Sequence, residues 1–256
     1  MTSEKTNIMA VIQARMSSTR LPGKVLMEIG GKPALYHVVN RVRKTAAVDR
    51  VIVAASRNPA DDPLQTYCET LDVVCFRGDE YDVLDRFYQA AVQYPAGAIV
   101  RITADCPLLD PSVTDRVVQA FLDERCDYAS NTLICTYPDG LDVEVFTFQA
   151  LERAWREARL LSEREHVTPY IKKHPEIFRL KNVKHDCDLS SLRWTLDEPA
   201  DLEFIRAVYD GASREFFGME EILSWLQSHP DLGRINQGIQ RNEGYQRSLR
   251  EDRIIK

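Results

Sequence analysis

The chain has 256 residues, of which 44% are hydrophobic and 28% charged, and this length fits one large α/β domain, or one domain with a small appendage. Its net charge of −6 argues against a nucleic acid as the main partner, because a protein that binds a phosphate backbone needs a basic face. No apolar run approaches the ~20 residues that span a bilayer, and the first residues lack the apolar core of a signal peptide, so we expect a cytoplasmic protein without a membrane partner.

Apolar runs alternate with helical patterns over the first half of the chain. Strands are predicted over 8–12, 50–55, 73–76 and 98–102, and helices over 33–44, 62–70, 83–94 and 112–124. Alternating strands and helices are typical of a mostly parallel sheet that is covered on both faces. We therefore predict an α/β fold with a Rossmann-like doubly wound sheet, which binds its ligand at the carboxyl ends of its strands.

The pattern changes after residue 127, where shorter strands are predicted. Strands are expected over 128–130, 141–146, 178–183 and 193–196, and helices over 148–158, 162–173, 200–209 and 219–227. The strand 141–146 alternates apolar and acidic side chains, which indicates one wet face, and Ser162 and Glu165 have the spacing of a capping box. We expect a flexible tail over 1–7, a single domain over 8–235 and a polar tail over 236–256 that orders only against a partner or the body of the protein.

The loop after the first predicted strand concentrates positive charge and hydroxyl groups. Arg15, Arg20 and Lys24 lie within ten residues, with three hydroxyl side chains between them at 17–19. Backbone N–H groups, hydroxyls and forked guanidinium donors together suit the oxygens of a triphosphate. The alternative is an ordinary basic surface loop. Neither a Walker pattern nor a G-x-G-x-x-G is present, so a P-loop NTPase or a dinucleotide enzyme is not expected.

Two aspartates follow predicted strands and so belong to the same edge of the sheet as this loop. Asp105 comes after the strand 98–102, and Asp197 after the strand 193–196. A pair of carboxylates facing a triphosphate suits Mg²⁺, which prefers oxygen ligands and keeps several waters. The alternative for each is a helix cap, because both precede a proline and a helix.

A second group of polar residues lies further along the chain. Asp142 and Glu144 point to one face of their predicted strand, either to bind sugar hydroxyls or accept a proton, or as a solvated edge. Arg164 and His166 follow in the helix 162–173, where they are placed to contact an acidic acceptor. A single helical histidine is more often structural, so that alternative stays open.

The quoted loop resembles the nucleotide loop of a known enzyme family. Gln13-Ala14-Arg15 and the string from Ser18 to Lys24 are similar to the cytidylyltransferases that make CMP-activated acidic sugars, namely the CMP-3-deoxy-manno-octulosonate synthetases and the acylneuraminate cytidylyltransferases. The resemblance covers Ile8 to about Tyr209 and is closest to the spore coat polysaccharide biosynthesis protein F-like branch. It implies a sheet of the nucleotide-diphospho-sugar transferase type and a nucleotide site made of Gln13, Ala14, Arg15, Ser18, Thr19, Arg20, Lys24, Ser56, Arg77 and Gly78.

The resemblance also implies the roles of the other candidate residues. It makes Asp105 and Asp197 the ligands of the catalytic Mg²⁺. The implied catalytic residues are Arg15, Arg20, Lys24 and Asp105, and the implied acceptor-binding residues are Asp142, Glu144, Arg164 and His166. A small β-containing subregion at about 128–185 would bind the acceptor and join two subunits of a homodimer.

The function that this resemblance implies is Mg²⁺-dependent transfer of a nucleotidyl group from CTP to an acidic sugar, with release of pyrophosphate, for surface polysaccharide or glycan biosynthesis. One alternative is transfer to a sugar phosphate, polyol phosphate or phosphonate, which would need an extra cationic pocket from Arg164, Lys172 and Lys173. The alternative of another class is a nucleotide-binding regulatory protein without turnover.

Overall fold

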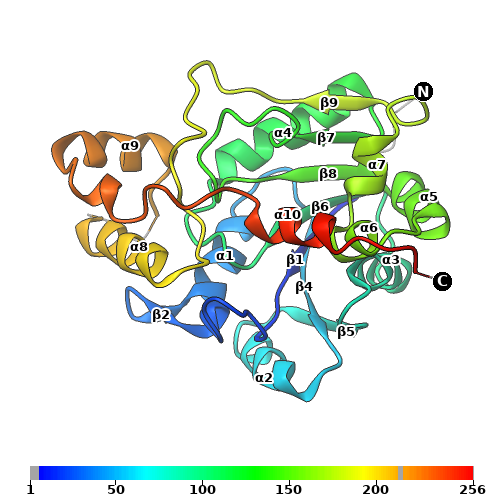
Figure 1. The fold of residues 1–256 in the computed structure, drawn as a ribbon, viewed down its shortest axis with the longest axis horizontal. Coiled ribbons are helices and arrows are strands. Elements are labelled where there is room, and N and C mark those ends of the chain that lie inside the picture. The colour runs from blue at the N-terminus through cyan, green and yellow to red at the C-terminus, as the bar shows by residue number, and fades with distance from the viewer. Residues whose placement is uncertain (1–5, 213–215, 256) are drawn as a thin grey trace.

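A seven-stranded sheet forms the centre of the molecule in the computed structural model, which describes residues 6–212 and 216–255 (Figure 1). In spatial order the strands are β5 (Val74–Gly78), β4 (Arg50–Ser56), β1 (Ile8–Gln13), β6 (Ala98–Thr103), β8 (Glu144–Thr147), β7 (Tyr128–Ser130) and β9 (Leu180–Asn182). Only β8 runs antiparallel to its neighbours within this sheet. The predicted α/β fold with a mostly parallel sheet is confirmed.

Helices cover the two faces of the sheet, and each face has its own apolar core. One core lies under α1 (Ala34–Arg43), α2 (Asp62–Thr70) and α4 (Pro111–Glu124), and the other under α3 (Val83–Gln93), α5 (Phe148–Glu157) and α7 (Pro169–Lys173). Strand β1 contributes Ala10 and Ile12 to the first core and Met9 and Val11 to the second. A strand that is buried on both faces must be apolar throughout, which is why its sequence shows no alternation.

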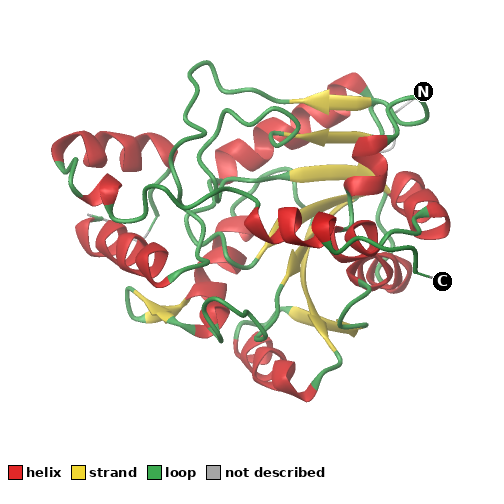
Figure 2. Cartoon of the chain, in the orientation of Figure 1, coloured by secondary structure: helices red, strands yellow, loops and turns green. Residues whose placement is uncertain are grey.

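A third apolar cluster lies at one end of the molecule, around α8 (Pro199–Gly211) and α9 (Met219–Ser228). A long segment without helix or strand joins β9 to α8 and contributes Trp194 and Leu196 to this cluster (Figure 2). The remaining elements are short: the hairpin of β2 (Glu28–Ile29) and β3 (Lys32–Pro33), the helices α6 (Leu161–His166) and α10 (Glu243–Arg250), and the 3-10 turns Lys24–Leu26, Pro59–Asp61 and Leu232–Arg234.

Two of the predicted strands differ from the structure. The strand 141–146 begins only at Glu144, and it has no wet face because Val145 packs into one apolar core, Phe146 into the other, and Glu144 is buried. The segment 193–196 is not a strand, since Arg193 forms only an isolated bridge with Asp139. Tertiary hydrogen bonds hold residues 141–143 and 193–196 instead of a strand ladder: Asn131 bonds the backbone of Leu141 and Val143, and the N–H of Leu196 donates to the carbonyl of Asp105.

The predicted helix 162–173 is two helices, α6 and α7. It breaks at Val167, whose φ of 71° lies in the left-handed region that β-branched residues avoid. The predicted capping box was also wrong, because the carboxylate of Glu163, not Glu165, accepts the free N–H groups of Arg159 and Leu160 at 3.1 Å each. Because of this break, the side chains of α6 and those of α7 point in different directions.

The expected polar tail after residue 236 contains a helix in the structure. Helix α10 packs against α6 and crosses the front of the sheet in Figure 1. Most of the expected tail 1–7 lies outside the described residues. Within the described part of the chain, the helices are too short and too polar for any of them to cross a membrane.

Candidate active site

A cavity of about 580 Å³ opens at the carboxyl ends of β1 and β6. Its walls come from the loop after β1, the segment after β6, the segment before β8, the helices α6 and α7, and the chain around α10. Its position matches the general rule that doubly wound sheets bind ligands beyond the carboxyl ends of their strands. The candidate residues that line it are Gln13, Arg15, Ser18, Thr19, Arg20, Lys24, Asp105, Asp142, Glu144, His166, Lys172 and Asp197.

Lys24 is the centre of the polar contacts on the nucleotide side of this cavity. Its Nζ donates to Oδ2 of Asp105 and to Oδ1 of Asp197, at 2.6 Å each, and the residue is 7% exposed. Burial alone would lower the pKa of Lys24, but the two carboxylates outweigh it and raise that pKa above its usual value. Burial alone would likewise raise the pKa of Asp105, whereas Lys24 lowers it to about 2. Lys24 and Asp105 are therefore both charged at neutral pH.

The arginines of the loop after β1 differ in their contacts. Arg20 pairs with Asp197 at 3.0 Å and with Glu243 of α10 at 2.8 Å. Arg15 is exposed at the cavity and has no ion pair with any described residue. The hydroxyl of Ser18 accepts the N–H of Leu21 at 3.3 Å, which supports the turn that leads to Lys24. The loop thus presents both a paired and an unpaired guanidinium to the cavity.

Asp105 and Asp197 fit a divalent cation on the chemistry of their donors. One oxygen of each lies 2.6 Å from the same ammonium nitrogen, so the two carboxylates already converge on one positive charge. Mg²⁺ prefers such oxygen ligands and takes its remaining ones from water and substrate phosphates. Within residues 6–212 and 216–255, no group of three or more histidines, cysteines, aspartates and glutamates could hold a metal ion. The assignment of Asp105 and Asp197 as Mg²⁺ ligands stays a prediction.

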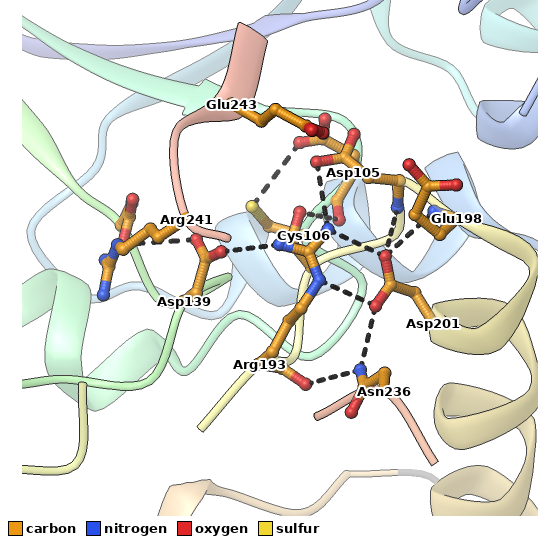
Figure 3. Close-up of polar contacts among 12 residues, drawn as sticks. Asp105, Cys106, Asp139, Arg193, Glu198, Asp201, Asn236, Arg241 and Glu243 are labelled. Carbon is orange, nitrogen blue, oxygen red and sulfur yellow. Dashed lines mark hydrogen bonds and ion pairs between the residues drawn. The ribbon is translucent and has the colours of Figure 1, made fainter. Parts of the chain in front are cut away.

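The buried ion pair of Arg193 and Asp201 (Figure 3) fixes the backbone at Asp197. Asp201 is 0% exposed and accepts two hydrogen bonds from Arg193, at 2.9 Å each. Its Oδ2 also accepts the backbone N–H groups of Asp197 and Glu198 at 2.9 Å, and its Oδ1 accepts Nδ2 of Asn236. The sequence analysis missed Asp201, although the spacing of Glu198 and Asp201 before an apolar helix is that of an N-terminal cap.

Replacing Asp201 with alanine should lower the free energy of unfolding by about 3–5 kcal/mol, because it leaves the buried Arg193 without its main partner. Urea unfolding of the variant measures this change. Asp210→Ala is the matched control, since Asp210 is an exposed aspartate of the same helix. Equal stability of the two variants would show that the ion pair of Asp201 and Arg193 contributes nothing to the free energy of unfolding.

Glu144 is held by four donors on the acceptor side of the cavity. Its Oε1 accepts from Tyr128 at 2.6 Å, Thr168 at 2.5 Å and Lys172 at 3.3 Å, and its Oε2 pairs with Arg101. Burial would raise the pKa of Glu144, but Lys172 and Arg101 together with the two hydroxyls hold it well below its usual range. These contacts favour a positioning role for Glu144, which orients two cations, over the direct acceptor contact that we expected.

Asp142 lies beside it and is also paired. Its carboxylate accepts from Arg241, a residue of the chain before α10, and Arg241 further approaches Asp139 at 3.6 Å. Burial raises the pKa of Asp142, and the charge of Arg241 opposes that shift. The turn between these aspartates depends on Gly140, which has a φ of 106° and where an added Cβ would lie 2.6 Å from the backbone N of Thr195, so a side chain has no room there.

His166 lines the cavity and contacts α10. Its Nε2 lies 2.9 Å from Oγ of Ser248, and its ring packs edge-on against Tyr245, with the ring centroids 5.0 Å apart. Burial lowers the pKa of His166 to about 4, a shift that Glu165 opposes and the nearby Arg101 favours. The imidazole is therefore neutral at physiological pH.

This shift predicts a loss of stability in mild acid. As the pH falls below 6.5, the unfolded chain protonates His166 while the folded chain does so only near pH 4, so stability declines between these values. Between pH 7.5 and 5.0, the decline should be smaller in His166→Gln than in the wild type by about 1–2 kcal/mol. Urea unfolding at the two pH values measures it, and identical declines would show that the histidine is not the cause.

Five of the predicted site residues do not line the cavity, namely Ala14, Ser56, Arg77, Gly78 and Arg164. Arg77 donates to the carbonyl of Asn58 at 3.0 Å and pairs with Asp62 at 2.8 Å, which holds the loop after β4. Arg164 pairs with Asp82 and donates to the carbonyl of Trp155 at 2.6 Å. Their roles in nucleotide or acceptor binding stay predictions.

The fold and the site together define a class. A doubly wound sheet, a cationic loop after its first strand and two carboxylates that converge on one cation are the features of an α/β enzyme that acts on a nucleoside triphosphate.

Comparison with known proteins gives the family. The family model described as cytidylyltransferase matches residues 9–216, so the chain belongs to the cytidylyltransferases, nucleotidyltransferase enzymes that use CTP. The chain is similar to the spore coat polysaccharide biosynthesis protein SpsF of Bacillus subtilis, with 36% identity over 233 residues, 88% of this chain and 96% of that protein. It is 37% identical over 120 residues, 46% of each chain, to a 3-deoxy-manno-octulosonate cytidylyltransferase of Pelobacter propionicus.

A solved structure agrees with this assignment. A cytidylyltransferase from Leptospira borgpetersenii has 31% sequence identity and a TM-score of 0.87, over 92% of this chain and 100% of that one. The resemblance inferred from the loop is thereby confirmed at the level of the family.

Proposed function

We propose that this chain is a Mg²⁺-dependent cytidylyltransferase that transfers CMP from CTP to an acidic sugar, for surface polysaccharide or glycan biosynthesis. The observation that supports it most is the cluster in which Lys24 joins Asp105 and Asp197 next to the cationic loop. The two relatives are named as a spore coat polysaccharide biosynthesis protein and a 3-deoxy-manno-octulosonate cytidylyltransferase. These names support an acidic sugar as the acceptor and polysaccharide biosynthesis as the pathway.

The residues of the nucleotide side suit an in-line displacement. The acceptor hydroxyl forms a bond to the α-phosphorus of CTP, the bond from that phosphorus to pyrophosphate breaks, and the hydroxyl proton goes to solvent. Arg15, Arg20 and Lys24 bind the triphosphate oxygens and stabilise the leaving pyrophosphate. Mg²⁺ on Asp105 and Asp197 would lower the pKa of the acceptor hydroxyl and offset the charge of the phosphates.

The acceptor side supports an anionic substrate. Arg101 and Lys172 both line the cavity and share the single charge of Glu144, so these three side chains together carry one positive charge. Asp142 on the same side is already paired with Arg241. The larger cationic pocket that a phosphorylated acceptor would need is not assembled, because Arg164 pairs with Asp82 outside the cavity. A carboxylate therefore fits this wall better than a phosphate dianion does.

Pyrophosphate release with Mg²⁺, measured for the four nucleoside triphosphates against a panel of acceptors, tests the proposal. The panel contains nonulosonic acids, 3-deoxy-manno-octulosonate, sugar 1-phosphates, polyol phosphates and phosphonates. We expect release with CTP and an acidic sugar only. Release confined to a phosphorylated acceptor would replace the proposed substrate, and CTP binding without release across the panel would favour the regulatory alternative.

The homodimer joined through residues 128–185 is also part of this proposal, and it rests on the family resemblance. Light scattering at micromolar concentration tests it, and a monomer mass would remove it.

A further inference from the structure

The last described part of the chain forms one wall of the cavity, although it lies beyond the residues that the family model matches. We call residues 236–255 the C-terminal arm. Asn242, Glu243, Gly244, Tyr245, Gln246 and Arg247 of this arm line the cavity. In Figure 1 the arm runs from the α8–α9 end of the molecule across the front of the sheet to α6.

The arm is attached to the body of the protein along its whole length. At its start, Nδ2 of Asn236, 4% exposed, donates to the carbonyl of Arg193 at 2.9 Å (Figure 3). At its end, Asp252 accepts the N–H and the hydroxyl of Ser162 at 3.0 and 2.8 Å, and the N–H of Leu161 donates to the carbonyl of Arg253 at 2.9 Å. These contacts fix the position of α10 over the cavity.

The direction of α10 follows from the contacts at its two ends. Glu243, its first residue, pairs with Arg20 on the nucleotide side, and Ser248, in its second turn, contacts His166 and Glu165 of α6 at 2.9 and 2.8 Å. Arg247 is four residues after Glu243, so it lies on the same face of the helix and about 6 Å further along the axis. Arg247 therefore reaches the cavity on its acceptor side.

Arg247 has no partner of its own within the described chain. A glutamate four residues before an arginine on a helix normally pairs with it, but Glu243 pairs with Arg20 instead, at 2.8 Å. Arg247 is exposed at the cavity and forms no ion pair with any residue of 6–212 or 216–255. The other two cations of the acceptor wall, Arg101 and Lys172, are both held by Glu144.

We propose that Arg247 binds the carboxylate of the acidic sugar, so that the C-terminal arm provides the acceptor subsite with its anion-binding group. This inference rests on the proposed function, because it assigns the acceptor of that same reaction to a residue. A guanidinium fork suits a carboxylate through two parallel hydrogen bonds, and Arg15 remains available for the triphosphate on the opposite wall. The arm then distinguishes acceptors, while the loop after β1 binds the nucleotide.

Kinetics of Arg247→Ala, with the acidic sugar that the wild type uses, test this assignment. Losing a charge-assisted hydrogen bond should raise the KM for that sugar about 10- to 100-fold, with the Kd for CTP unchanged. Arg247→Lys should recover part of the loss, because it keeps the charge but not the fork. Arg250→Ala is the matched control, since Arg250 is an exposed arginine of the same helix outside the cavity.

The outcomes separate this inference from the proposed function. If Arg247→Ala and Arg250→Ala behave alike in an enzyme that turns over an acidic sugar, the inference is wrong and the function stands. If Arg247→Ala weakens CTP alone, Arg247 belongs to the nucleotide side and the inference is again wrong. If the wild type releases no pyrophosphate, the proposed function is wrong. Calorimetry of 3-deoxy-manno-octulosonate binding to the CTP-loaded protein then tests the inference separately. Binding that is lost in Arg247→Ala would support the inference, and binding that is equal in the two proteins or absent from both would overturn it.

Discussion

Replacing Asp105 with asparagine should lower the rate of pyrophosphate release by about 10²- to 10³-fold, by analogy with the loss of one preorganised group in other active sites. Asparagine keeps the shape of the side chain but removes the charge that Lys24 contacts at 2.6 Å, and with it one proposed Mg²⁺ ligand. Stopped assays at saturating CTP measure the rate.

The control for this variant is Asp123→Asn, since Asp123 is an exposed aspartate of α4 that does not line the cavity. In Asp105→Asn, the stability of the folded state should also lose the pH dependence that the Asp105 ion pair gives it. The lowered pKa of Asp105, about 2, means that its ion pair stabilises the folded state above the usual value near 3.8 and loses that contribution as the pH falls toward 2. Wild-type turnover by Asp105→Asn would exclude Asp105 from the reaction.

Lys24→Met should reduce the rate by a similar factor of about 10²–10³, because methionine keeps the length of the chain but removes its charge. The same change removes the ammonium group that lowers the pKa of Asp105, so the pKa of Asp105 should rise. The pH profile of the residual activity, measured between pH 5 and 9, should therefore shift upward relative to the wild type.

The double variant Lys24→Met/Asp105→Asn gives the sharper result. Residues that act as one unit lose activity non-additively, so the double variant should be little worse than either single variant. If the two losses multiply instead, Lys24 and Asp105 act independently, and the cluster seen in the structure is not the catalytic unit.

The nucleotide side could be predicted from the sequence because its residues follow strands. Arg15 and Asp105 come directly after apolar runs, and Lys24 ends the loop that begins at Arg15; a parallel sheet brings the carboxyl ends of such runs together whatever the distance along the chain. The location of Asp197 beside them was also predicted, although the segment before it is not a strand. The positions of functional residues at strand ends can therefore be predicted with little knowledge of the tertiary structure.

The acceptor side could not be predicted in the same way. The alternation around Glu144 indicated a wet face, but this glutamate is 5% exposed because Arg101, from a strand 43 residues earlier, neutralises it. The charged Arg101 within an otherwise apolar predicted strand was the one signal of a buried partner. Helix α10 was missed because it has no apolar stripe, and polar contacts such as Ser248 to Glu165 hold it instead.

The contact between Glu243 and Arg20 has a consequence for how each substrate affects the affinity for the other. Arg20 belongs to the proposed triphosphate site, and its guanidinium is now shared with Asp197 and Glu243. A triphosphate that takes over Arg20 competes with Glu243, which stands one helical turn before Arg247. Nucleotide and acceptor affinities are then thermodynamically linked through a single helix, and each substrate must change the affinity for the other by the same factor.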